Sequence, residues 1–558
     1  GFRHGDYKSA WDYWYQNTLP RYAQKEGKPN DFRKLEPGEE GGQLYHLWYT
    51  PLWQLGDFGL GLGLFFQLLI VLLLLLSVVG IINAWTIHYF ASDAYGGDQV
   101  SHRDLKLTLQ GSASCDRSEY VCLNADCAVI SDKLRRPCEL SKAQGYLDLV
   151  GVLMIIGILM LVGKAQDLSA EEMDESEQTA QDYAVIVQDP DHDAKDPEEW
   201  RAFFSRFGHV TYVTVALDNG DLLEALALRR TCLYNVHVNS KNEGEEKSAL
   251  NITDKLTREE PLPHWKALAQ KLGFMRDLVW WHEKLVVVQA SVAELTKRQY
   301  SAVKVFVTFE LEESQRKCLQ AMTTGLIPAM MEHAGAIHDD LKFRGTNVLH
   351  ITEAYEPSQV RWRNLQYGLF PRMIEQAKMT AVATGVVLAA GLLVWGFSEA
   401  QAGWAAIVIS VNNSILPVLM KMINVHEHHH SDSAQQSSLM FKLVAAQWMN
   451  TAFIIYITKP QEDILDYTYV KQVSAILWAD AFTNPILLVL DIGGRVNRFF
   501  FAKRATTQLK MNSYFQGTSW FLAERYAAMV KTVFVCLFFS TIFPLGYFIS
   551  SVAMLVAY

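Results

Sequence analysis

The sequence predicts a membrane α-helical bundle of about eight spans that carries a separate α+β domain in the cytosol. Half of the 558 residues are hydrophobic, and the chain holds 15 Trp and 28 Phe. Its mean hydropathy of +0.04 is high for a soluble protein but low for a chain made only of membrane helices. Long apolar runs flank the stretch 163–378, which contains none of its own. These observations together indicate a bundle plus a water-soluble domain.

The first two expected spans enclose a loop that is rich in cysteine. Residues 1–58 are polar and aromatic and lack the apolar core of a cleavable signal peptide, so we expect a cytosolic segment there. Apolar runs at 59–84 and 146–162 predict two transmembrane helices within the segment 59–162. Their connecting loop spans 92–144. It contains four of the seven cysteines: Cys115, Cys122, Cys127 and Cys138.

The spacing of these cysteines sets the expected orientation of the chain. The pattern C-x6-C-x4-C-x10-C lacks the paired C-x2-C of common zinc sites, although zinc binding is the alternative. Two disulfides in an oxidising compartment fit the cluster better, which places the loop outside the cytosol and the N-terminus inside. We expect an integral membrane protein of the plasma membrane, with an endomembrane as the alternative.

The domain expected at 163–378 alternates strands and helices. Strand-like runs occur at 181–190 and 301–310, and each precedes a helix, the first of which begins at Pro197. One or two long helices are expected at 264–298, between the two halves. This order predicts a ferredoxin-like or RRM-like sheet that is split by a helical insertion.

Such a sheet raises the question of RNA binding. RNA-binding sheets carry aromatic residues that stack on bases. The run at 301–310 keeps Phe306 and Phe309, but Lys304 occupies the first stacking position. The domain is not evidently basic, and the net charge of the chain is −10. We therefore expect no nucleic acid partner.

The remaining spans are expected in a pore-type bundle at 379–558. They are 379–397, 404–423, 439–457, 470–495 and two within 526–558. The segment 495–525, which this count places in the cytosol, is rich in Arg and Lys. Positive residues prefer the cytosolic side of a membrane, so the charge pattern agrees with the count.

The span Val470–Arg495 is unusual because it carries polar residues within an apolar run. Asp480, Asn484 and Asp491 are spaced by four and eleven residues, which places them near one stripe of a helix. A carboxylate facing lipid is costly, so we expect the stripe to face other helices or water. Pro485, Gly493 and Gly494 predict a kink or hinge. The two interpretations are a pore-lining, gating helix and a polar seam that holds the bundle together.

Polar residues also occur on the neighbouring spans. Asn412 and Asn413 lie in one span, and Lys531 begins another, where it either pairs with a carboxylate or reaches the cytosolic interface. A further set shares a helix face at i, i+3 and i+4. It consists of Gln447, Asn450 and Thr451. Because conduction requires polar groups along a path through an apolar barrier, we interpret all of these as pore-lining or gating residues.

The run His426-Glu427-His428-His429-His430 invites a metal interpretation. Consecutive residues on a short loop cannot all face one ion, so we expect no metal site there. The sequence contains no glycine-rich phosphate loop and no nucleophile elbow. We therefore expect no cofactor and no enzyme activity.

Three stretches carry distinctive patterns: WRNL (362–365), which follows EPSQV; 410–442, which has an acidic-His and Ser-rich pattern; and FFSTIFPLGYFISSVAMLVAY, which contains a proline. Together they resemble the OSCA family of hyperosmolality-gated, calcium-permeable stress-gated cation channels. The first resembles the family's W-x-N-L signature before a core span, the second resembles the next helix and cytosolic loop, and the third resembles a short Pro-containing hairpin. The resemblance covers most of 145–558. The soluble N-terminal segment and the Cys-rich loop depart from it.

The resemblance implies a function and an assembly. It implies a mechanically or osmotically gated, non-selective cation channel that is permeable to calcium and works as a homodimer, with one pore per subunit. Membrane lipids and permeating cations are the expected partners. The wider superfamily contains the anoctamins and lipid scramblases, so a phospholipid scramblase is the first alternative. A non-conducting structural subunit of a larger assembly is the second.

Overall fold

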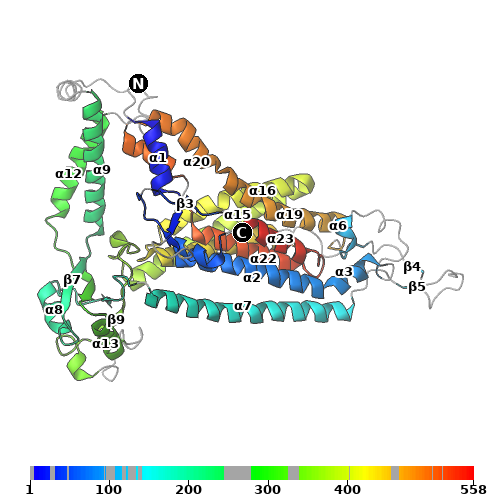
Figure 1. Cartoon of the computed structure of the whole chain (residues 1–558), viewed down its shortest axis with the longest axis horizontal. Coiled ribbons are helices and arrows are strands. Elements are labelled where there is room, and N and C mark those ends of the chain that lie inside the picture. Colours follow the sequence, from blue (N-terminus) through cyan, green and yellow to red (C-terminus); the bar gives the residue numbers. More distant parts are fainter. Residues whose placement is uncertain are drawn as a thin grey trace. The chain divides into compact units, whose positions relative to one another are not determined.

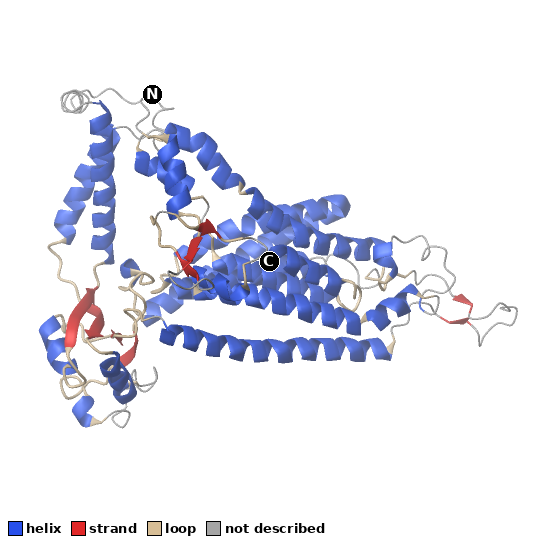
Figure 2. Cartoon of the chain, viewed as in Figure 1, coloured by secondary structure: helices blue, strands red, loops and turns tan. Residues whose placement is uncertain are grey.

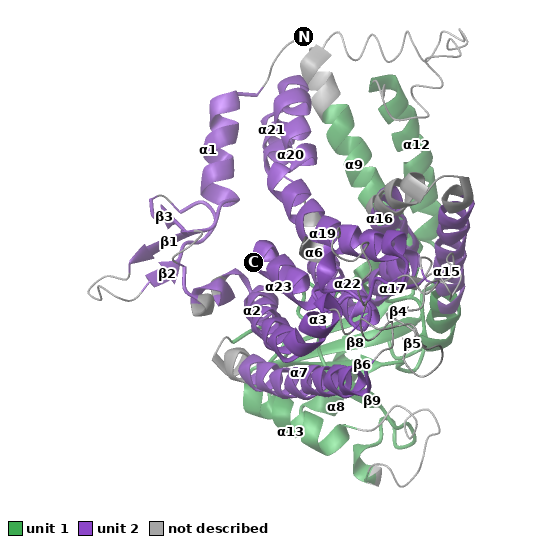
Figure 3. Ribbon diagram, turned by 90° about the vertical axis from the view of Figure 1, so that its right-hand side faces the viewer, with its two compact units in different colours: residues 1–2, 178–376, 427–435 green, residues 3–177, 377–426, 436–558 purple. Residues whose placement is uncertain are grey.

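The structure is a computed structural model of the chain (Figures 1 and 2). It describes residues 5–24, 32–39, 41–46, 50–92, 95, 107–115, 121–122, 134–135, 141–176, 178–243, 278–323, 338–400, 402–453, 456, 464–505, 507–517 and 520–558. These residues form two compact units, which Figure 3 draws in green and purple. Unit 1 consists mainly of Gln178–Gln376 and Glu427–Gln435, and unit 2 of Arg3–Glu177, Ala377–His426 and Gln436–Tyr558.

Unit 1 contains a four-stranded antiparallel sheet in the order β7-β8-β6-β9. Its strands are β6 (Ala184–Gln188), β7 (Val210–Leu217), β8 (Ala302–Phe309) and β9 (His350–Glu353). The crossover helices are α8 (Pro197–Phe204) and α13 (Glu312–Met322). This is the ferredoxin-like strand order, and it confirms the strands predicted at 181–190 and 301–310 and the helix predicted to begin at Pro197.

A pair of long helices interrupts the sheet sequence between β7 and β8. They are α9 (Gly220–Glu243) and α12 (Leu278–Leu295), which lie side by side (Figures 1 and 3). α12 lies within the helical stretch predicted at 264–298, of which residues 264–277 fall outside the described residues. Short 3-10 turns occur at Asp339–Leu341 (η2) and Trp362–Asn364 (η3).

The core of unit 1 lies between the sheet and its crossover helices. Trp200, Phe204 and Phe309 are buried there with the valines of β6 and β8. Asp196 caps α8 by accepting from the backbone N–H of Glu198, and Pro197 occupies the first turn, where its missing N–H costs nothing. The local sequence of α8 thus specifies both its start, through the Asp196 cap, and the apolar face that packs in the core.

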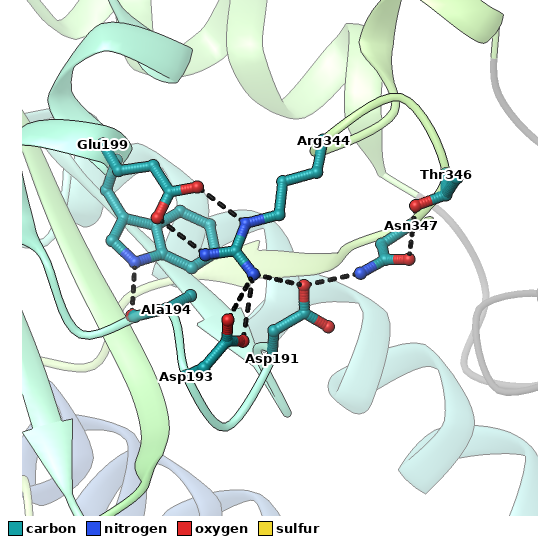
Figure 4. A network of polar contacts seen from close by, with 8 residues as sticks. Asp191, Asp193, Ala194, Glu199, Arg344, Thr346 and Asn347 are labelled. Carbon is teal, nitrogen blue, oxygen red and sulfur yellow. Dashed lines mark hydrogen bonds and ion pairs between the residues drawn. The ribbon is translucent and has the colours of Figure 1, made fainter.

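Arg344, in the turn before β9, forms ion pairs with Glu199 at the start of α8 and with Asp193 just before it (Figure 4). Its guanidinium donates to both carboxylate oxygens of Glu199 at 2.7 and 2.9 Å, and to Asp193 at 2.9 Å. Asp191 accepts from Asn347 at 2.6 Å beside them. Bidentate contacts of this kind fix orientation as well as distance, and they raise the pKa of Arg344 above its usual value.

Unit 2 is mostly helical, and four of its described helices are long and apolar enough to cross a membrane. These candidate spans are Leu60–Ile82, Lys142–Glu171, Leu369–Gly396 and Tyr467–Arg504. They fall in α2 (Leu60–Ile82), α7 (Lys142–Ser176), α15 (Leu369–Ala400) and the run from α19 (Tyr467–Leu490) through α20 (Ile492–Val496). Four of the expected spans thus have a counterpart that meets these criteria.

The other expected spans coincide with helices that are not among those four. They are α16 (Ala402–Val425), α17 (Asp432–Trp448), α22 (Leu522–Phe539) and α23 (Gly546–Ala557). A π-helical segment, η4 (Met449–Phe453), continues from α17. The first residues of α15 and α17 belong to unit 1 and the remainder to unit 2.

The N-terminal segment packs on the chain that follows α20. Helix α1 (Tyr7–Asn17) lies against α21 (Gln508–Phe515), and the ring of Phe515 meets those of Tyr7 and Trp11 at 5.1 and 5.3 Å. Both segments were predicted to be cytosolic. The smaller elements of unit 2 are β1 (Arg21–Gln24), β2 (Phe32–Lys34), β3 (Gln43–Leu44), η1 (Leu52–Phe58), α3 (Ala84–Ala91), α6 (Leu107–Gln110), β4 (Val121–Cys122), β5 (Leu134–Arg135), η6 (Asn497–Phe501) and η7 (Ala502–Arg504).

Candidate functional site

An ion pair lies inside the helical unit. Lys531 on α22 donates from Nζ to Oδ1 of Asp480 on α19 at 2.7 Å. The Lys531 side chain is 2% exposed and that of Asp480 is 12% exposed. The pairing confirms the first of the two alternatives for Lys531. Because two desolvated ions are stable only when their partners are well placed, this contact constrains how α19 and α22 pack.

A second polar cluster joins α16 to the π-helical segment η4. Asn450 donates from Nδ2 to Oδ1 of Asn413 at 2.8 Å, and Asn413 donates in turn to Oγ1 of Thr451 at 3.1 Å. Asn412 donates to the backbone carbonyl of Ala390 at 3.2 Å. Asn450 and Thr451 are fully buried. The structure therefore brings together four of the predicted polar residues from two spans.

Gln447 lies one turn before this cluster and is 8% exposed. Its side-chain oxygen has no hydrogen-bond partner among the described residues. The sequence placed it on one face with Asn450 and Thr451 by assuming an α-helical period. The helix widens into η4 at Met449, and such π segments change the phase of the side chains that follow. Helix propensities of the residues do not predict this change from an α-helix to a π-helix.

Asp491 follows the end of α19 and does not continue the stripe expected for Asp480, Asn484 and Asp491. It adopts a left-handed backbone with φ of 36°, and its carboxylate accepts from the N–H of Gly494 at 3.1 Å. Arg498 lies 3.5 Å from the same side chain. An added Cβ at Gly494 would lie 2.0 Å from Oδ2 of Asp491, so a larger residue there would have to displace the Asp491 carboxylate. The eleven-residue spacing assumed one straight helix, whereas α19 stops at Leu490.

The other residues predicted on this span lie on either side of that break. Asn484 and Pro485 are within α19, and the helix continues through Pro485 to Leu490. Gly493 follows the break, in the short helix α20. The break between α19 and α20 is thus located at Asp491, six positions after the proline.

A cavity of about 250 Å³ borders the ion pair. Asp480 and Arg525 contribute its charged groups, Pro485 also lines it, and most of the other lining residues are apolar, such as Phe65 and Met554. A cavity with two charged groups in an apolar wall can hold an amphipathic molecule, with its charged end at those groups.

Three histidines of the run 426–430 contact other groups of the protein. Within the described residues, no group of three or more His, Cys, Asp and Glu is placed to hold a metal ion. His429 shares a hydrogen bond of 2.9 Å with the fully buried Glu427, and His428 stacks on Tyr367 with ring centroids 3.8 Å apart. His430 contacts the carbonyl of Tyr367 at 2.9 Å. These three rings thus have contacts within the protein, and two of them involve Tyr367.

The same loop pairs with the WRNL stretch. Val360 and Ser431 form an antiparallel bridge, and Asn364 donates to the carbonyl of His429 at 2.8 Å. Trp362 covers Phe306 on the sheet, with ring centroids 5.3 Å apart. Two of the three stretches that carry the resemblance, WRNL and the 427–435 part of 410–442, therefore meet in unit 1. The sequence analysis did not predict this contact. The one feature in the sequence that could have indicated it is that both stretches carry unusual polar patterns.

The predicted disulfides stay a prediction. Cys115 follows α6 and Cys122 lies on β4, while Cys127 and Cys138 fall outside the described residues. The three remaining cysteines, Cys232, Cys318 and Cys536, are buried and unpaired.

Comparison with known proteins adds no assignment. No family model matches this chain, and no curated protein matches it either. Its function must therefore be argued from its residues.

Proposed function

We propose that this chain is a mechanically or osmotically gated, non-selective and calcium-permeable cation channel of the OSCA type. The polar contacts buried within an apolar helical unit carry the proposal. A path for ions needs polar groups on neighbouring helices, and the Asn413–Asn450 and Asp480–Lys531 contacts supply them on four different elements. About eight spans, a homodimer, a plasma-membrane location and a cytosolic N-terminus are part of this proposal.

The Asp480–Lys531 pair suggests how such a channel stays closed. While paired, Asp480 is neutralised by the adjacent ammonium group and offers little attraction to a cation. Membrane tension would favour a conformation with a larger in-plane area, and movement of α19 about the break at Asp491 would separate the pair. The exposed carboxylate would then favour cations in the open path.

Single-channel recording from purified protein in liposomes, with suction applied to the patch, tests this proposal. We expect stretch-activated cation currents. Their reversal potential in asymmetric salt should move toward the equilibrium potential of the anion in Asp480→Asn, and further toward it in Asp480→Lys. Asp466→Asn is the matched control, because Asp466 is exposed at the start of the same helix. Stretch currents with the same reversal potential in all four proteins would refute the role of Asp480.

The cavity beside Asp480 favours a phospholipid scramblase as the second candidate. A scramblase needs a groove in which a zwitterionic headgroup meets polar residues while its tails stay in hydrocarbon. Asp480 and Arg525 carry opposite charges in an otherwise mostly apolar cavity. A fluorescent-lipid scrambling assay on the same liposomes separates the two functions. Silence in both assays would favour a non-conducting structural subunit.

A further inference from the structure

A second cavity, of about 380 Å³, lies within unit 1 and is lined by basic residues. Lys304 of β8, Arg372 of α15 and His430 of the 427–435 loop border it, together with His350 of β9. The carboxylates of Asp189 and Glu353 also contribute to the lining. A volume of this size falls within the range of sites for small molecules.

Lys304 is an unusual residue for the middle of a sheet. It is 3% exposed, and its ammonium group donates to the neutral side-chain oxygen of Gln188. Burial lowers the pKa of Lys304 to about 8, the charge of Arg372 adds to the lowering, and Asp189 offsets only part of it. A buried cation whose hydrogen-bond partner is a neutral amide favours an anionic ligand that can pair with it.

Arg372 presents the second cation. Its Nη1 donates to Nδ1 of His430 at 2.7 Å, and Nε2 of the same ring lies 2.9 Å from the carbonyl of Tyr367. Both contacts suit a neutral imidazole, with its proton on Nε2. Burial and the nearby charges of Lys304 and Arg372 lower the pKa of His430 to about 3, so the ring stays neutral at pH 7.

We propose that this cavity binds a phosphomonoester, with Lys304 and Arg372 as its charge partners and His350 as a further hydrogen-bonding group. A phosphate dianion offers three acceptor oxygens, and a guanidinium with an ammonium group beside it is a common means of holding one. The bearer is either a soluble sugar or polyol phosphate or the headgroup of a phosphoinositide. This inference does not depend on the channel proposal.

The position of the cavity gives the ligand a structural consequence. Lys304 belongs to the sheet, Arg372 to the first turns of α15, and His430 to the loop that joins α16 to α17. A bound phosphate would add a shared counter-ion to these three segments of unit 1. Ligand binding would therefore strengthen the attachment of the 427–435 loop to the sheet.

Calorimetric titration of the purified full-length protein tests the proposal. The probes are inositol 1,4,5-trisphosphate in solution and nanodiscs with or without phosphatidylinositol 4,5-bisphosphate. We expect binding of at least one phosphorylated probe, weakened about tenfold or more in Lys304→Met and in Arg372→Gln. Arg363→Gln is the control, because Arg363 pairs with Glu224 in the same unit and does not line the cavity. Binding of the soluble probe indicates a free phosphate ligand, and binding of the nanodisc alone indicates a lipid.

A proton-uptake measurement adds a readout that misfolding would not mimic. Because the pKa of Lys304 lies near 8, an arriving dianion should raise it, and titration at pH 8 in buffers of different ionisation enthalpy should show proton uptake. The uptake should disappear in Lys304→Met. Absence of binding by every phosphorylated probe, equal binding of inorganic sulfate, or unchanged affinity in Arg372→Gln would overturn the proposal.

Discussion

Asp480 is the residue whose environment the sequence predicted best. Its place within an apolar run required a polar or charged partner, because a lipid-facing carboxylate is costly. The partner itself, Lys531, lies 51 positions away on another helix, and sequence alone left its pairing as one of two alternatives. Which of many polar residues meet across a bundle depends on helix rotation, which a hydrophobic pattern sets only coarsely.

Breaking this pair from one side should be costly. Asp480→Asn leaves the Lys531 ammonium buried without a counter-charge, so we expect a loss of about 3–5 kcal/mol of stability. Lys531→Met should cost a similar amount, whereas the double variant should recover much of the loss because neither charge remains. Thermal unfolding of all four proteins in nanodiscs measures this cycle. Additive losses in the double variant would show that the contact contributes little.

Asp491 illustrates where residue-level reasoning from the sequence failed. A spacing of eleven residues places two side chains on one stripe only if the helix is continuous between them. The left-handed backbone at Asp491 breaks that continuity, and the Asp491 carboxylate accepts a hydrogen bond from the N–H of Gly494. Aspartate tolerates this conformation better than most residues, but nothing in the surrounding apolar run marked the position.

Among the elements, the sheet of unit 1 was predictable and the π-helical segment was not. β6 and β8 are short runs rich in Val, each bounded by turn residues, and such runs specify strands through local propensity. The order β7-β8-β6-β9 then follows from the connections between strands and helices. The π-helical segment Met449–Phe453 contacts α16, which is distant in the sequence, and no local pattern marks it.

The packing of α1 on α21 supports an element-scale prediction. Phe515 is fully buried there and joins α21 to the aromatic face of α1. Phe515→Ala should cost about 3–5 kcal/mol locally and release α1. Hydrogen exchange of residues 7–17 should become much faster while that of α22 stays unchanged. Tyr15→Ala is the control, because Tyr15 is exposed on α1, and equal protection in both variants would contradict the contact.

At the scale of the whole molecule, the division into units departs from a simple reading along the chain. The sequence placed the soluble domain at 163–378, and most of unit 1 falls within those bounds. The segment Glu427–Gln435 also belongs to unit 1, although two helices separate it from the rest. No local pattern could reveal this, because the contacts with Val360 and Asn364 join residues more than sixty positions apart.

Membrane topology gives a whole-molecule prediction. Lys142 and Lys510 are both exposed and lie on opposite sides in the proposed orientation. On intact cells, a membrane-impermeant maleimide should label Lys142→Cys, whereas Lys510→Cys should react only after permeabilisation. The parent protein should stay unlabelled until a reductant is added, because its outer cysteines are expected to be paired. Labelling of Lys510→Cys on intact cells would show that the chain has the opposite orientation in the membrane.

The late return of the chain to unit 1 affects how the protein is made. A ribosome adds about 5–20 residues per second, so Ala377–His426 separates the two parts of unit 1 by several seconds. During that interval Phe306 and Leu365 have already been synthesised, but the segment carrying Ser431 has not. The nascent domain must therefore wait, with part of its surface uncovered, until two further helices have left the ribosome.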